Sequence, residues 1–157
     1  LMCAMLPCRA RPLVRLGARS LFTRVGEIGR ASRTYTKEDV AAFASLTLDD
    51  NPMHTDAAGS DANSRFGRPI VHGMLYASMF SAIVGQECPG AIYLSQSLEF
   101  RKPVYLGDTL TAEIEVQCVQ GGGRLLEFAT RCSNQDLVIV LDGSARVLMP
   151  RRPRSGR

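Results

Sequence analysis

The stretch 73–84 constrains the fold most, because nearly every residue in it is apolar or small. We interpret it as a helix, and a helix that is apolar on nearly all sides is one that other elements cover. Gly85 and then Pro89 and Gly90 supply the signals that end it. The covering layer must therefore come from elsewhere in the chain.

Four later segments have β-branched or alternating character, and turn residues rich in Gly, Asn and Asp separate them. In the second of these segments, polar residues alternate with apolar ones, so one face of that strand should be exposed to solvent. The turn between the third and fourth segments is polar. Helices come early and antiparallel strands late, which predicts an α+β fold with a sheet packed on one central helix. The expected strands are 91–100, 109–119, 124–132 and 137–148.

The segment before the central helix begins with an expected strand at 25–34. Thr36 can cap a following helix, whose apolar stripe includes Val40 and Phe43. This helix should end near Leu48, because the pair Asn51-Pro52 disfavours helical geometry. A loop is expected at 49–56, and 57–66 has weak helical character.

The charge of the chain is unevenly divided. Of the 19 basic residues, five lie within 1–26 and four within 150–157, so 27–149 holds ten against all 15 acidic residues, a net charge of −5. A nucleic-acid binder would carry its basic patch on the folded domain, so no nucleic-acid partner is expected. No apolar run approaches the length that crosses a bilayer, so no membrane insertion is expected. The five cysteines form no C-x-x-C pair, which leaves metal-ligand spacing unsupported.

The two ends of the chain differ in composition from the middle. Residues 1–23 are rich in Arg, lack acidic residues and contain Leu, Ala and Ser, which is typical of a mitochondrial transit peptide. An unstructured tail without a targeting role is the alternative. Residues 150–157 are expected to be a disordered basic tail. The single folded domain is then 24–149, located in the mitochondrial matrix.

The candidate chemistry lies in two short stretches that contain both histidines of the chain. The first has Asp49, followed by Asn51, Pro52 and His54; the second runs 66–75 and has His72 directly before Gly73 and Met74. An imidazole titrates near neutral pH, so an Asp/His pair on a stiff loop suits proton transfer. A loop-capping Asp and a satisfied buried His are the alternatives. His72 could orient Gly73 or line a pocket.

These residues and their order resemble the MaoC-like (R)-specific enoyl-thioester hydratases of the hot-dog fold, including the mitochondrial hydroxyacyl-thioester dehydratases of type 2. The shared motifs are Asp-x-Asn-Pro-(aliphatic)-His, then Phe-Gly-x-Pro-Ile-x-His-Gly-Met-Leu, and later Gly-Asp-x-Leu. The resemblance covers about residues 24–149. It implies a curved antiparallel sheet around a long central helix, and a homodimer with an acyl tunnel near the subunit interface.

The resemblance also implies residue roles. Asp49 and His54 match the family's catalytic pair, and Gly73 matches the glycine whose backbone N–H holds the thioester oxygen. Asn51 matches a structural asparagine, and Pro52, His72 and Met74 would support the loop or the pocket. The family usually has Gly before the catalytic aspartate, where this chain has Leu48. Leu48 suggests a different loop path or a changed pocket wall.

The function expected is therefore a hydro-lyase: a (3R)-3-hydroxyacyl-[acyl carrier protein] dehydratase of mitochondrial fatty-acid synthesis, without a cofactor or metal. The main alternative is an (R)-specific enoyl-CoA hydratase of fatty-acid breakdown. A hot-dog thioesterase and a non-catalytic acyl-binding subunit are further alternatives. The substrate would be an acyl carrier protein or CoA thioester, and five basic residues could form a local docking patch. These are Arg65, Arg68, Arg101, Lys102 and Arg124.

Overall fold

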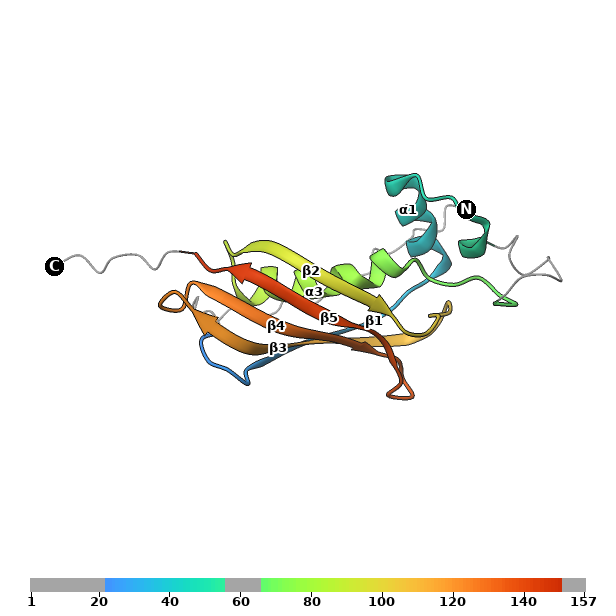
Figure 1. Cartoon of the computed structure of the whole chain (residues 1–157). Helices are drawn as coiled ribbons and strands as arrows, with labels where there is room; N and C mark the ends of the chain where they lie inside the picture. The colour runs from blue at the N-terminus through green and yellow to red at the C-terminus, as the bar shows by residue number, and fades with distance from the viewer. Residues whose placement is uncertain (1–21, 56–65, 151–157) are drawn as a thin grey trace, which may run out of the picture.

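The computed structural model describes residues 22–55 and 66–150, and Figure 1 shows one curved sheet with a long helix lying along it. The order of elements is β1 (Ile28–Thr34), α1 (Lys37–Thr47), η1 (Pro52–His54), α3 (Gly73–Glu87), β2 (Ile92–Phe100), β3 (Thr109–Gln120), β4 (Leu125–Ser133) and β5 (Ile139–Leu148). Most of the tail residues expected at each end of the chain lie outside the described residues, as do residues 57–65 of the expected weak helix.

The five strands form one antiparallel sheet in the order β1-β3-β4-β5-β2. Their inward side chains alternate with outward ones, as the period of two in the sequence predicts. On β3 the inward residues Leu110, Ala112 and Ile114 are fully buried. The α+β arrangement expected from the sequence is confirmed, and each of the four later strands begins and ends within two residues of its expected bounds.

Helix α3 packs its apolar residues against the sheet, but one side of it stays open in the single chain. Its buried residues include Phe80 and Ile83, whereas Met74 is 59% exposed. The central helix expected from the sequence is confirmed, and part of its surface stays exposed in the single chain because one sheet covers only one face. Among the described residues, no helix combines the length and apolar character needed to cross a bilayer.

The beginning of the fold differs in two details from the expectation. Strand β1 begins at Ile28, because Gly26 has a left-handed backbone (φ +86°) and turns the chain just before it. Phe22 is buried and meets Phe128 edge to face at 5.1 Å between ring centroids. Packing into the core thus begins two residues before the domain boundary expected at residue 24.

Close approach of β5 and β2 depends on Gly143. A Cβ atom at this position would lie 1.9 Å from the backbone oxygen of Ser97, which is far inside van der Waals contact. The two strands can pair here because this residue has no side chain. This pairing holds the end of β2, and with it Phe100, beside the first turn of α3.

Candidate active site

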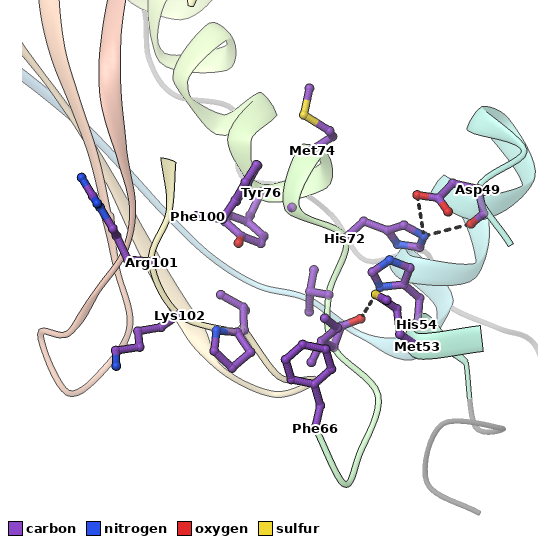
Figure 2. Close-up of a pocket in the computed structure, with 15 residues that line it drawn as sticks. Asp49, Met53, His54, Phe66, His72, Met74, Tyr76, Phe100, Arg101 and Lys102 are labelled. Carbon is purple, nitrogen blue, oxygen red and sulfur yellow. Dashed lines mark hydrogen bonds and ion pairs between the residues drawn. The ribbon is translucent and has the colours of Figure 1, made fainter. Parts of the chain in front are cut away.

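A cavity of about 480 Å³ opens at the N-terminal end of α3. Three segments far apart in sequence form its walls: the loop after α1, the residues leading into α3, and the residues that follow β2 (Figure 2). Asp49, His54, His72, Gly73 and Met74, all expected from the sequence, line it. Its other lining residues are Met53, Phe66, Ile70, Val71, Tyr76, Phe100, Arg101, Lys102, Pro103 and Val104.

Asp49 reaches the cavity because α1 ends in a tight left-handed turn. Thr36 and Asp39 form a reciprocal capping box at the start of the helix, and Leu48 ends it with φ 62° and ψ 21°. Leu48 thus adopts the backbone conformation that a glycine favours, and its side chain is 84% exposed and is not among the lining residues. Within the described residues, Leu48 therefore does not form part of the cavity wall.

His54 is held by a short 3₁₀ turn, Pro52–His54, within the loop that the sequence predicted. The Asn51 side chain accepts a hydrogen bond from the backbone N–H of Met53 at 3.3 Å, and Pro52 begins the turn. Asn51 and Pro52 thus shape the loop and do not line the cavity. The loop-supporting role that the resemblance implies for these two residues stays a prediction.

The tautomer of His54 follows from its hydrogen bond to the backbone. Its Nδ1 lies 2.8 Å from the carbonyl oxygen of Ile70, and a carbonyl only accepts, so Nδ1 donates. In the neutral ring, Nε2 then carries the lone pair and is the nitrogen that can exchange a proton. A carboxylate oxygen of Asp49 and ring nitrogens of His54 and His72 all lie within 4.8 Å of one another.

His72 lies between the two residues of the candidate pair, and Figure 2 shows its ring against that of His54. The ring centroids are 3.7 Å apart and the planes differ by 25°. The Nε2–H of His72 donates to the backbone oxygen of Asp49 at 3.0 Å, and Nε2 is 3.9 Å from Asp49 Oδ2. The sequence predicts a supporting role for His72 beside Gly73 or in the pocket wall, and its contacts with Asp49 and His54 come from the structure alone.

Gly73 is the first residue of α3 and lines the cavity. Backbone N–H groups in the first turn of a helix have no partner within the helix and carry the positive end of its dipole. A Cβ at Gly73 would lie 2.6 Å from Cε1 of Phe100, so a side chain here would displace that ring. The first turn of α3 can thus present N–H donors to an oxygen bound in the cavity.

Sequence reasoning missed the aromatic wall of the cavity. Phe66, Tyr76 and Phe100 come from a turn, a helix and a strand end, and no local pattern connects them. Tyr76 and Phe100 meet edge to face at 6.0 Å. Burial raises the pKa of Tyr76, so its hydroxyl stays protonated at neutral pH. The wall therefore offers an apolar surface without a further charge.

The basic residues expected to form a docking patch do not all gather at the cavity. Arg101 and Lys102 line it, but Arg101 is engaged with Glu99 at 2.6 Å and Asp142 at 3.0 Å. Arg68 stacks on the Tyr105 ring at 3.8 Å. Arg124 precedes β4 at the opposite end of the sheet, and Arg65 lies outside the described residues. Arg124 therefore does not belong to such a patch.

The Asp49, His54 and His72 group has a spacing that could hold a metal ion. A metal would bind lone pairs of unprotonated nitrogens. His72 Nε2 and His54 Nδ1 instead donate to carbonyl oxygens, so the lone pairs left for a metal are those of His54 Nε2, the Asp49 carboxylate and the buried His72 Nδ1. The hydrogen bonds of the group thus suit proton transfer better than metal coordination.

Comparisons with known proteins identify the family of the chain. Residues 26–135 match the model of the MaoC like domain. An (R)-specific enoyl-CoA hydratase of Aeromonas caviae is 44% identical over 86% of this chain and 100% of its own length. A mitochondrial 3-hydroxyacyl-[acyl-carrier-protein] dehydratase of Arabidopsis thaliana is 36% identical over 85% of this chain and 81% of its own.

Solved structures give the same result for the fold. The (R)-hydratase from A. caviae involved in PHA biosynthesis superposes with a TM-score of 0.77, covering 85% of this chain and 100% of that structure, at 44% identity. The hot-dog arrangement expected from the sequence is thereby confirmed.

Proposed function

Because the chain belongs to the MaoC-like family of hydro-lyases, we infer that it is a (3R)-3-hydroxyacyl-[acyl carrier protein] dehydratase acting in mitochondrial fatty-acid synthesis. It is an enzyme of the hydratase and dehydratase class. Under this proposal the reaction is a reversible syn elimination of water that gives a trans-2-enoyl thioester. Asp49 and His54 are its catalytic residues, and Gly73 binds the thioester oxygen.

The elimination makes three demands, and the cavity offers a group for each. The C2–H bond breaks to a base, its electron pair forms the C2–C3 double bond, and the C3 hydroxyl takes a proton and leaves as water. The lone pair of His54 Nε2 and the Asp49 carboxyl share the two proton transfers. The thioester oxygen, which gains negative charge, accepts from the Gly73 N–H at the start of α3.

One observation carries this assignment: Asp49, His54 and Gly73 face the same cavity although three separate turns of the chain supply them. In other enzymes, a preorganised donor to a developing oxyanion contributes about 3–4 kcal/mol of transition-state stabilisation. The apolar wall made by Tyr76 and Phe100 suits the acyl chain, which needs a water-free surface.

Residues outside the active site support the acyl carrier protein as the carrier. The Arg-rich, acid-free segment 1–23 has the composition of a mitochondrial transit peptide, and curated relatives from two plants are mitochondrial carrier-protein dehydratases. Under this proposal, 24–149 is the catalytic domain in the matrix and 150–157 a basic tail. Lys102, at the cavity itself, would meet the phosphate of the pantetheine arm with either carrier and does not separate the two.

A specific observation favours a second candidate, an (R)-specific enoyl-CoA hydratase. The relative from A. caviae, which bears that name, is more similar in sequence than the plant dehydratases, at 44% against 36% identity. The two candidates share one chemistry and differ in carrier. Rates of hydration of crotonyl thioesters on acyl carrier protein and on CoA, compared at equal concentration, separate them. A larger kcat/KM with the CoA thioester would contradict the first proposal.

Substitution of Asp49 tests the catalytic site. Asp49→Asn keeps the shape of the side chain but removes its proton-transfer capacity, so kcat should fall on the order of 100-fold or more. Loss of enoyl-thioester absorbance measures the rate, and the chirality of the product checks the (R) configuration. Asp50→Asn is the matched control, because Asp50 is the neighbouring carboxylate and does not line the cavity.

Three results would contradict this proposal. Wild-type turnover in a folded Asp49→Asn variant would exclude Asp49 as a catalytic residue. Release of free thiol from acyl-CoA, without hydration, would favour the thioesterase. A protein that binds acyl thioesters but converts none would be the non-catalytic subunit.

A further inference from the structure

His72 is an unusual residue to bury. Its exposed fraction is 2%, and among the described residues only Thr130 is a comparably buried polar side chain. Thr130 is hydrogen-bonded to Gln96 within the sheet. The Nδ1 atom of His72, by contrast, is buried without a hydrogen-bond partner in the described part of the chain. A buried polar atom left without a protein partner is unfavourable, so packing alone does not explain an imidazole at this position.

The other ring nitrogen of His72 reaches across to the loop after α1. Its Nε2–H donates to the backbone oxygen of Asp49, a contact between residues 23 positions apart in sequence. The bond holds the peptide that directly follows the Cα of Asp49. On the N-terminal side of Asp49, the left-handed backbone of Leu48 sets the path of the chain. With the backbone held on both sides of Asp49, the direction in which its side chain leaves the backbone is also set.

The face of the same ring restrains His54. The two imidazoles stack at 3.7 Å between centroids, while His54 Nδ1 is tied to the carbonyl oxygen of Ile70. The stack and the hydrogen bond together prevent rotation of the His54 ring. Its Nε2 therefore keeps one direction towards the cavity.

We propose that His72 is a positioning residue that holds Asp49 through its N–H and His54 through its ring face, so that both point at the same acyl carbons. This inference rests on the function proposed above. His72 does not itself exchange protons with the substrate, because one nitrogen is engaged with Asp49 and the other is shielded from solvent. Its position next to Gly73 also connects the pair to the start of α3.

Three variants of His72 separate positioning from simple packing. His72→Ala removes both contacts, His72→Gln restores an N–H donor near the Nε2 position, and His72→Phe keeps only a stacking ring. Val147→Ala is the stability control, because Val147 is fully buried in β5 near the end of the sheet away from the cavity. The purified full chain is used for all of them.

Two measurements are made on each variant. The first is kcat and KM with a crotonyl thioester, and the second is hydrogen–deuterium exchange of the backbone in 49–54, which requires no turnover. His72→Ala is expected to lower kcat by about 30-fold or more with KM within about threefold, and to speed exchange in 49–54. His72→Gln should regain at least tenfold in kcat over the Ala variant, and Phe should regain less.

The inference and the proposed function fail in different ways. A wild-type protein without hydration activity would refute the proposed function, and the exchange data would still decide whether His72 holds the loop. A folded His72→Ala variant with wild-type kcat, or with unchanged exchange in 49–54, would overturn the inference. The same holds if Val147→Ala, at an equal loss of thermal stability, lowers kcat as much.

Discussion

Leu48 has a backbone conformation that disfavours its own side chain. At φ 62° the left-handed region costs a residue with a Cβ roughly 1–2 kcal/mol, whereas glycine adopts it freely. The Leu48 side chain adds little packing energy to offset this cost, because the residue is 84% exposed. The left-handed turn at Leu48, which directs Asp49 into the cavity, therefore lowers the stability of the protein.

Replacing Leu48 by glycine should therefore stabilise the protein. Leu48→Gly is expected to raise the free energy of unfolding by about 0.5–1 kcal/mol, after the greater flexibility of glycine in the unfolded chain is subtracted. Urea unfolding measures the difference. Leu46→Gly is the matched control: Leu46 is equally exposed but lies inside α1, so glycine should cost about 1 kcal/mol there. Equal losses in both variants would contradict strain at Leu48.

Gly73 should be more sensitive in activity than in stability. A methyl group there would collide with the Phe100 ring at 2.6 Å, but that ring is 49% exposed and can turn away. Gly73→Ala is thus expected to cost no more than about 1–2 kcal/mol of stability. Its kcat/KM with a crotonyl thioester should fall about tenfold or more, because the moved ring and the new methyl group occupy the cavity.

The control for this variant lies on the same helix. Gly85→Ala meets no atom within 4 Å and should stabilise α3 by about 0.5–1 kcal/mol without changing turnover. An unchanged kcat/KM in Gly73→Ala would show that the start of α3 tolerates a side chain and does not bind the thioester closely.

At the scale of elements, the position of Asp49 depends on helix α1, which ends just before it, and α1 is stabilised by the capping box at its N-terminus. The backbone N–H of Thr36 lowers the pKa of Asp39, and the Arg33 guanidinium at 2.8 Å lowers it further, against the opposing effect of burial. The pKa of an aspartate in the unfolded state is near 3.9. A carboxyl group whose pKa is lower than this in the folded state stabilises the fold at every pH above the unfolded value. That contribution is lost as the pH falls through the folded value.

Asp39→Asn should therefore show a pH-dependent loss of stability. Near pH 7 the variant is expected to unfold about 1 kcal/mol more easily than the wild type, because the charge in the capping box is lost. Near pH 2–3 the difference should shrink, since the wild-type carboxyl is then protonated too. Urea unfolding at both pH values measures it, with Asp50→Asn as the control. A difference that is constant with pH would contradict the shift.

At the scale of the whole molecule, the edge of the sheet at β2 and one face of α3 are open in the described part of the chain. Among the described residues, β2 pairs with β5 alone, as β1 at the opposite edge pairs with β3, so the outer edge of β2 has unpaired backbone groups. Large apolar residues are exposed along it, among them Ile92, Leu94 and Phe100, each about half exposed. An exposed strand edge can pair with a strand of another chain. In the homodimer that the family resemblance implies, a second copy of this chain would supply that strand.

A charge on this edge should prevent that pairing. Leu94→Arg is expected to shift the protein from dimer to monomer in light scattering coupled to size exclusion, because a buried unpaired guanidinium is strongly unfavourable. Leu137→Arg is the control, since Leu137 is 84% exposed in the turn between β4 and β5. A wild-type protein that is monomeric at micromolar concentration would refute the dimer.

The sequence by itself determined the order of the elements and the candidate pair. Hydrophobic period and turn residues are local signals, so α3 and the late strands could be placed to within a few residues. Asp49 and His54 lie five positions apart on one loop, which made their proximity readable before any fold was known.

Only the tertiary structure decided what surrounds that pair. The contact of His72 with Asp49 and the approach of Phe100 to Gly73 join residues distant in sequence, and they depend on how the sheet wraps around α3. The open face of α3 and the left-handed turn at Leu48 were likewise not predicted. Such contacts follow from the packing of whole elements, which periodicity along the chain does not encode.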